Sequence, residues 1–288
     1  MEPLMNLLRH SGNHDPVFKK AIDDVLSDIA ACPDDKCLEL SSELERRYVL
    51  DHIERIWQNL AMVERALGVM RCATQPSILD IGTSPLTFIY KQYFQAVDMF
   101  TIDRTALLAE RCRDHHIDHR VCNLLHEPIP LADGQMDMVV FTEVLEHLNT
   151  GPGRIFSEIN RILKPGGTLV FSLPNMAMLK NRIAAMLGKP VLEPVYAVFK
   201  EEKSEQSQGD GEWVHGLGHI REYTMSETTD IVRRYGFEVQ STRSADAFID
   251  PPDRFSRLRR IAWPVYRIAS RIVPNSRMIN LVLARKTL

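Results

Sequence analysis

The sequence is poor in cysteine and has no long apolar run. Its five cysteines are an odd, widely spaced set, which argues against a disulfide framework and against a cysteine-ligated zinc site. No apolar stretch approaches the ~20 residues of a membrane-spanning helix, and the first residues make a poor signal peptide. We therefore expect reduced thiols and residence in the cytoplasm.

The composition is that of a globular protein with an uneven charge distribution. Apolar residues make up 44% and charged residues 25% of the 288 residues, which suits a folded α/β domain with insertions. Eight arginines, one lysine and no acidic residue lie between Arg254 and Lys286, although the net charge is −3. The C-terminal end should therefore present a basic surface on an otherwise acidic protein.

The hydrophobic pattern changes near residue 76. Residues 16–31 and 41–70 space their apolar residues as two amphipathic helices would. Short apolar runs that read as strands then alternate with helical segments at 106–115 and 150–163, and Pro165 is expected to end the second of these helices. The expected strands up to this point are 77–81, 98–103, 119–124, 136–141 and 167–173.

The alternation stops after Pro174 and resumes later. A short helix at 175–188 and a polar segment precede a helix at 225–236, a strand at 237–244, a basic helical region and a last strand at 278–286. We predict an α/β fold with a doubly wound, seven-stranded, mostly parallel sheet. Its expected parts are a helical N-terminal extension (1–75), a sheet core (76–175), a lid insertion (176–217) and the C-terminal part of the sheet (218–288).

The stretch ILDIGTSPLT, residues 78–87, marks the candidate site. Asp80 and Gly82 end the first strand, and Asp103 ends the second about 20 residues later, where an acid can accept hydrogen bonds from ribose hydroxyls. Ser84 and Leu86 occupy later positions at which a pyrophosphate-binding loop needs glycine. A dinucleotide-dependent oxidoreductase is thereby weakened but stays an alternative.

Residues 78–175 resemble the core of class I S-adenosylmethionine-dependent methyltransferases. The resemblance is carried by ILDIG, FTEVLEHL and ILKPGGTLVFSLPN. Residues 218–239, GHIREYTMSETTDIVRRYGFEV, are similar to a segment of the subgroup that contains ubiquinone-type and sugar or glycan methyltransferases. The resemblance implies a Rossmann-like fold, S-adenosyl-L-methionine as cofactor, residues 76–175 as its binding core, and O-methylation of a sugar, glycan or small-molecule hydroxyl.

The resemblance also assigns cofactor-binding residues. The methionine part would lie beside Asp80, Gly82, Thr83 and Ser84, and the ribose beside Asp103. The adenine would lie beside Arg104, Asn123 and Leu124, and the floor of the site would be formed by Thr142 and Glu143.

Catalytic candidates follow the fourth strand. A hydroxyl acceptor must lose its proton during attack, and among Glu143, Glu146 and His147 we favour His147 as the base. The same residues have an E-x-x-E-H spacing that resembles a magnesium site of some ubiquinone O-methyltransferases, with two carboxylates on one helical face. The alternative is that Glu146 faces solvent and His147 packs under the helix.

Further histidines fall into two groups. His215, His219 and Arg221 follow the lid insertion and are expected to contact the acceptor, with ordinary structural contacts as the alternative. His115, His116 and His119 precede or begin the third strand, away from the expected site, and are interpreted as a solvated turn.

The basic segment 254–273 mixes arginine with Leu, Ile, Trp and Tyr, as a helix at a membrane surface does. Pro264 is expected to interrupt it, and an ordinary helix between the last two strands is the alternative. Nucleic acid is not an expected partner, because the body is acidic and no stacking motif accompanies the arginines. A non-catalytic binding or scaffold protein on the same fold remains the rival to an enzyme, supported by the glycine-poor loop.

Overall fold

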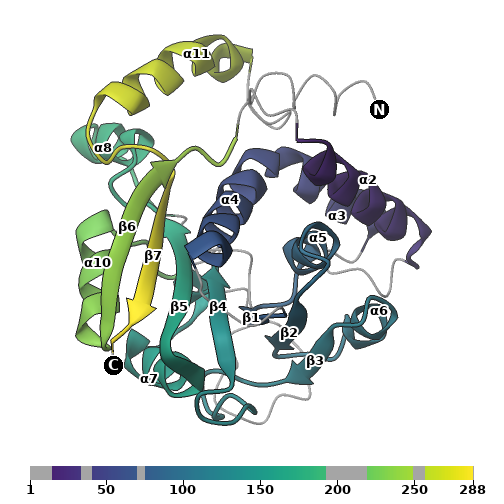
Figure 1. The fold of residues 1–288 in the computed structure, drawn as a ribbon. Helices are drawn as coiled ribbons and strands as arrows, with labels where there is room; N and C mark the ends of the chain where they lie inside the picture. Colours follow the sequence, from purple (N-terminus) through teal and green to yellow (C-terminus); the bar gives the residue numbers. More distant parts are fainter. Residues whose placement is uncertain (1–14, 34–40, 70–74, 193–218, 249–256, 288) are drawn as a thin grey trace, which may run out of the picture.

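The computed structural model contains one seven-stranded sheet (Figure 1). It describes residues 15–33, 41–69, 75–192, 219–248 and 257–287. The strand order is β3-β2-β1-β4-β5-β7-β6, parallel except that β7 runs antiparallel to both of its neighbours. The strands are β1 (Ser77–Ile81), β2 (Asp98–Asp103), β3 (Asp118–Val121), β4 (Met136–Thr142), β5 (Leu163–Pro174), β6 (Phe237–Ala245) and β7 (Ile279–Lys286). The predicted doubly wound, mostly parallel sheet is confirmed.

Helices surround this sheet. They are α2 (Pro16–Ala31), α3 (Ser42–Asp51), α4 (Ile53–Val69), α5 (Pro85–Tyr93), α6 (Ala109–Asp114), the 3-10 turn η2 (Leu145–His147), α7 (Pro152–Ile162), α8 (Leu179–Met186), α10 (Met225–Arg234) and α11 (Arg257–Ile272). None of those helices is long and apolar enough to cross a bilayer.

Two hydrophobic cores lie on opposite faces of the sheet. Successive side chains of a strand point to opposite faces, so Ile78 of β1 packs among residues of α2, α4 and α5, whereas Leu79 packs among residues of α7 and α10. Strands buried on both faces read as continuous apolar runs, which explains why β4 could be recognised in the sequence.

Three sequence-based expectations about where helices break are wrong. The helix expected at 41–70 breaks at His52, which separates α3 from α4. Helix α7 ends at Ile162 because Leu163 is already extended, so Pro165 lies inside β5 rather than at the helix end. Helix α11 continues through Pro264, which therefore does not interrupt it.

Candidate functional site

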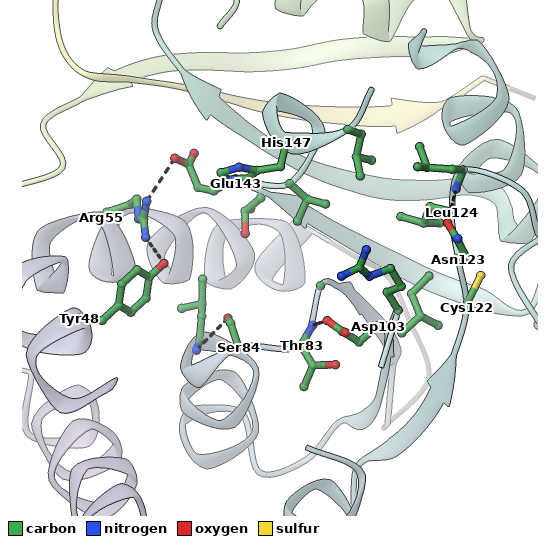
Figure 2. Close-up of a pocket in the computed structure, with 18 of the residues that line it drawn as sticks. Tyr48, Arg55, Thr83, Ser84, Asp103, Cys122, Asn123, Leu124, Glu143 and His147 are labelled. Carbon is green, nitrogen blue, oxygen red and sulfur yellow. Dashed lines mark hydrogen bonds and ion pairs between the residues drawn. The ribbon is translucent and has the colours of Figure 1, made fainter. Parts of the chain in front are cut away.

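A pocket of about 320 Å³ opens at the carboxyl ends of the parallel strands (Figure 2). The strand order reverses between β1 and β4, and ligands of open parallel sheets bind at this point. The volume is within the range of small-molecule sites. His147 lines the pocket. So do nine of the ten expected cofactor residues, namely Gly82, Thr83, Ser84, Asp103, Arg104, Asn123, Leu124, Thr142 and Glu143.

Gly82 is required by the backbone at the end of β1. Its φ is +91°, a conformation that side-chain-bearing residues rarely adopt. A Cβ at this position would lie 2.8 Å from Val144 Cγ2. The chain can therefore turn into the pocket here only with glycine.

Asp103 at the end of β2 fixes two loops beside the pocket. Its Oδ2 accepts a hydrogen bond from the Thr83 N–H (3.2 Å), and its Oδ1 accepts one from the Thr105 N–H (2.9 Å; Figure 2 shows the first). A carboxylate oxygen can accept more than one hydrogen bond. Asp103 thus keeps acceptor capacity for a ligand's hydroxyl groups.

The missing later glycines are replaced by the start of a helix. Ser84 is the N-cap of α5, its Oγ accepts from the Leu86 N–H (3.2 Å), and Pro85 occupies the first turn. Thr87 Oγ accepts from the Ser84 N–H (3.0 Å) and donates to Asp80 Oδ2 (2.6 Å). The pocket wall is therefore a capped helix terminus, not a glycine-rich loop.

Asp80 lies beneath this loop and is the one expected cofactor residue that does not line the pocket. Burial raises the pKa of the Asp80 carboxyl to about 7, although the hydrogen bond from Thr87 acts in the opposite direction. Asp80 therefore acts on the pocket through Thr87 and the loop.

Glu143 follows β4 in a strained conformation. Its φ is +56°, which is uncommon for a residue with a side chain and is typical of functional sites. Ser172 Oγ donates to Glu143 Oε1 (2.8 Å), and Arg55 Nη1 donates to Oε2 (3.3 Å; Figure 2). The helical face expected to carry Glu143 with Glu146 is therefore wrong, because η2 begins only at Leu145 and Glu143 binds other partners.

Three residues of the N-terminal helices complete the pocket and were not expected from the sequence. Tyr48 of α3 and both Arg55 and Ile56 of α4 line it, and Arg55 Nη2 donates to Tyr48 Oη. Burial opposes the charge of Arg55, but Tyr48 and Glu143 outweigh it and raise the pKa of the guanidinium. The only sequence signal for their role is that Tyr48 and Arg55 are polar residues within amphipathic helices.

Glu146, His147 and His219 form a cluster next to the pocket. One potential ligand atom from each lies within 4.8 Å of the others. The Glu146 side chain is 1% exposed, and neither carboxylate oxygen has a hydrogen-bond partner in the described part of the chain. Burial, and then the charge of Glu143, raise the pKa of Glu146 well above its usual value. The alternative that Glu146 faces solvent is wrong.

Backbone pairing brings His219 to this cluster. The Ile220 N–H donates to the Glu146 carbonyl (2.8 Å), and the rings of His147 and His219 lie 5.1 Å apart. His219 Nδ1 lies 2.9 Å from Glu222 Oε1, which orients the ring. Because His219 is far from Glu146 and His147 in the sequence, their proximity could not be predicted.

The other residues expected to contact the acceptor are not placed at the pocket. Arg221 pairs with Glu227 (2.8 Å), is largely exposed and does not line the pocket. His215 lies outside the described residues. His115, His116 and His119 precede or belong to β3, and none of them lines the pocket.

Residues 79–171 match the family described as "Methyltransferase domain". The chain is 30% identical over 141 residues to a probable S-adenosylmethionine-dependent methyltransferase of Mycolicibacterium smegmatis, covering 49% of this chain and 42% of that protein. It is 26% identical over 176 residues to the malonyl-[acyl-carrier protein] O-methyltransferase of Marinomonas sp., covering 57% of this chain and 63% of that protein. Dimethylglycine N-methyltransferase of Parasynechococcus marenigrum is 27% identical over 117 residues, or 41% of this chain and 39% of its own length. The chain thus spans less than half the length of two of these three relatives.

Solved structures share the fold. An S-adenosylmethionine-dependent methyltransferase of Thermotoga maritima has a TM-score of 0.53 at 16% identity, covering 84% of this chain and 93% of that chain. The [4+2]-cyclase SpnF has a TM-score of 0.50 at 17% identity, covering 81% of this chain and 82% of that chain. At these identities the likeness shows the fold and not the reaction.

Proposed function

We propose that this chain, a class I S-adenosylmethionine-dependent methyltransferase by its sequence and fold, binds S-adenosyl-L-methionine in the pocket and transfers its methyl group. The observation that carries the proposal is the meeting of Gly82 and Asp103 at the rim of one pocket of suitable volume. The bound cofactor would supply an electrophilic methyl group on a sulfonium. The protein then has to align the acceptor, exclude water and handle one proton.

The lining residues suit the three parts of this cofactor. Asp103 has acceptor capacity for ribose hydroxyls. Asn123 Oδ1 accepts from the Leu125 N–H (3.0 Å), so its amide is held in place to meet the adenine edge, with Leu124 and Arg104 beside it. The loop of Gly82, Thr83 and Ser84 would enclose the methionine part.

We propose an oxygen of a sugar, glycan or other small molecule as the acceptor, and His147 as the base. His147 lines the pocket and its side chain is 34% exposed, so its ring can reach an acceptor hydroxyl and take the proton. The neighbouring carboxyl of Glu146 and the ring of His219 would stabilise the charge that His147 then gains. Relatives with N- and O-methyltransferase names leave nitrogen as the competing acceptor atom.

A divalent cation is a second way in which this cluster could work. A buried carboxylate without a hydrogen-bond partner needs a proton or a cation, and Glu146, His147 and His219 offer one oxygen and two ring nitrogens. Such a mixed set of oxygen and nitrogen ligands suits manganese, iron or zinc better than the magnesium of the sites that the E-x-x-E-H spacing resembles. A bound cation would orient an acceptor oxygen and lower its pKa, and His147 would then be a ligand rather than a base.

Mass spectrometry of the purified protein tests the assignment against its rivals. Co-purified S-adenosylmethionine or its demethylated product is expected. Co-purified nicotinamide dinucleotide would instead support the oxidoreductase. A protein that binds neither cofactor on titration would support the non-catalytic scaffold.

A further inference from the structure

Helix α11 turns its apolar stripe away from the protein. Leu258, Ile261, Val265, Ile268 and Ile272 follow one another at intervals of three and four residues and therefore share one face. Their side chains are between 60% and 80% exposed. A surface helix of a globular protein normally turns such a stripe toward the core. The orientation of α11 thus needs a partner that covers this face.

The opposite face of α11 is fixed to the protein. Trp263 and Ser270 are buried, and the Trp263 ring lies 6.5 Å from the ring of Phe248, which precedes α11 in the chain. The buried carboxylate of Asp246 lies 3.9 Å from both Arg267 and Arg271. Because these contacts set the rotation of the helix about its axis, the stripe cannot turn inward without breaking them.

Helix α8 carries further exposed apolar side chains near α11. It lies beside α11 at one end of the molecule (Figure 1), where Arg182 Nη2 donates to the Pro274 carbonyl (3.0 Å) just after α11. Ile183, Met186 and Leu187 at its end are exposed. Among the described residues, α8 with Leu187 and α11 hold eight of the twelve exposed large hydrophobic side chains, and we refer to these eight as the apolar patch.

The charges around the apolar patch indicate the kind of partner that fits it. Neither α8 nor α11 contains an acidic residue, whereas Arg257 and Arg260 on α11 and Lys180 and Lys189 in or beside α8 are exposed and basic. A second copy of this surface would place basic residues against basic residues. An anionic partner with an apolar interior would satisfy both the stripe and the charges.

We propose that the apolar patch docks the protein on an anionic membrane surface, with α11 lying in the plane of the interface. The exposed aliphatic side chains enter the boundary between headgroups and acyl chains, and the arginines contact anionic headgroups. Docking of this kind requires no membrane-spanning helix.

The apolar patch and the pocket lie at the same edge of the sheet. Helix α8 follows the carboxyl end of β5, and α11 lies between the end of β6 and the start of β7, which pair with each other and with that end of β5. An amphiphilic acceptor held at the membrane would therefore be near the pocket. This statement about the acceptor rests on the proposed function, whereas the docking does not.

Vesicle co-sedimentation of the full chain, without cofactor or acceptor, tests the docking. Binding to phosphatidylcholine vesicles that contain phosphatidylglycerol is expected, with much weaker binding to phosphatidylcholine alone and a decrease at high salt. Ile261→Gln with Ile268→Gln should weaken binding at least about tenfold, because apolar burial is lost. Arg257→Gln with Arg260→Gln should weaken it and reduce its salt dependence.

The matched control is Val17→Gln with Leu44→Gln, which removes two exposed apolar side chains of α2 and α3, outside the patch, and should leave vesicle binding unchanged. Equal binding of the stripe and control variants would overturn the proposal. So would a dimer in light scattering that the stripe variant alone converts to monomer, because the patch would then be an interface between copies. Cofactor titration of the same variants keeps this result separate from the proposed function.

Discussion

Arg55 of α4 and Glu143 at the end of β4 form an ion pair of 3.3 Å across the pocket, although 88 residues separate them in the chain. The pair ties the N-terminal helices to the sheet edge at which the ligand is proposed to bind. Both side chains are largely buried, so neither charge can turn to solvent when its partner is removed.

Arg55→Gln should therefore lower the free energy of unfolding by about 2 kcal/mol and weaken cofactor binding, because Glu143 loses a charged hydrogen-bond donor. Urea unfolding and calorimetry measure the two effects. Arg65→Gln on the exposed side of α4 is the control. Equal losses in both variants would contradict a specific role of the pair.

Asp80→Asn should reduce the pH dependence of stability. The folded pKa of Asp80, about 7, lies above the unfolded value of 3.8, so the native state holds a proton that the unfolded state has lost. Its contribution is present below the unfolded pKa and is lost as the pH rises through 7. Between pH 5 and 8 the wild type should lose about 3 kcal/mol from this group, and the variant should not. Identical shifts of the urea unfolding midpoint with pH in both proteins would refute the raised pKa of Asp80.

His147→Ala should slow methyl transfer to an identified hydroxyl acceptor by roughly 100-fold or more while leaving cofactor affinity unchanged. His126→Ala, an exposed histidine outside the pocket lining, is the control. Turnover measured at saturating cofactor separates an effect on methyl transfer from an effect on cofactor binding. Full activity of the His147 variant would remove this residue as the base.

Glu146→Gln discriminates between a protonated carboxyl and a cation ligand. If a cation binds the cluster, calorimetric titration of the wild type with Mn²⁺ should show binding that the variant loses at least about tenfold. Glu127→Gln on the loop after β3 should retain it. Absence of Mn²⁺ binding in the wild type, together with a more stable Gln variant, would leave His147 as a base without a metal.

The sequence predicted what depends on local pattern. The buried strands, Gly82 and Asp103 could be recognised because strand ends and their spacing are encoded within short segments. The resemblance to a known family supplied the expected roles of Asn123 and Thr142, both of which line the pocket. Local pattern also identified α11 as an amphipathic basic helix.

Contacts across the chain could not be predicted in the same way. Arg55 reaches Glu143, and His219 reaches His147, only after the helices and the β4 edge have packed. The left-handed backbone of Glu143 has no sequence signal, because most such residues are glycine. The outward rotation of α11 depends on Asp246 and Trp263, which a helical pattern alone does not reveal.

The cofactor site is tested by calorimetric titration of the wild type, Gly82→Ala and Asp103→Asn with S-adenosyl-L-methionine. We expect binding by the wild type and a dissociation constant at least about tenfold higher in each variant, since Gly82 shapes the loop and Asp103 is proposed to accept the ribose hydroxyls. Unchanged binding in both variants, or none in the wild type, would contradict it.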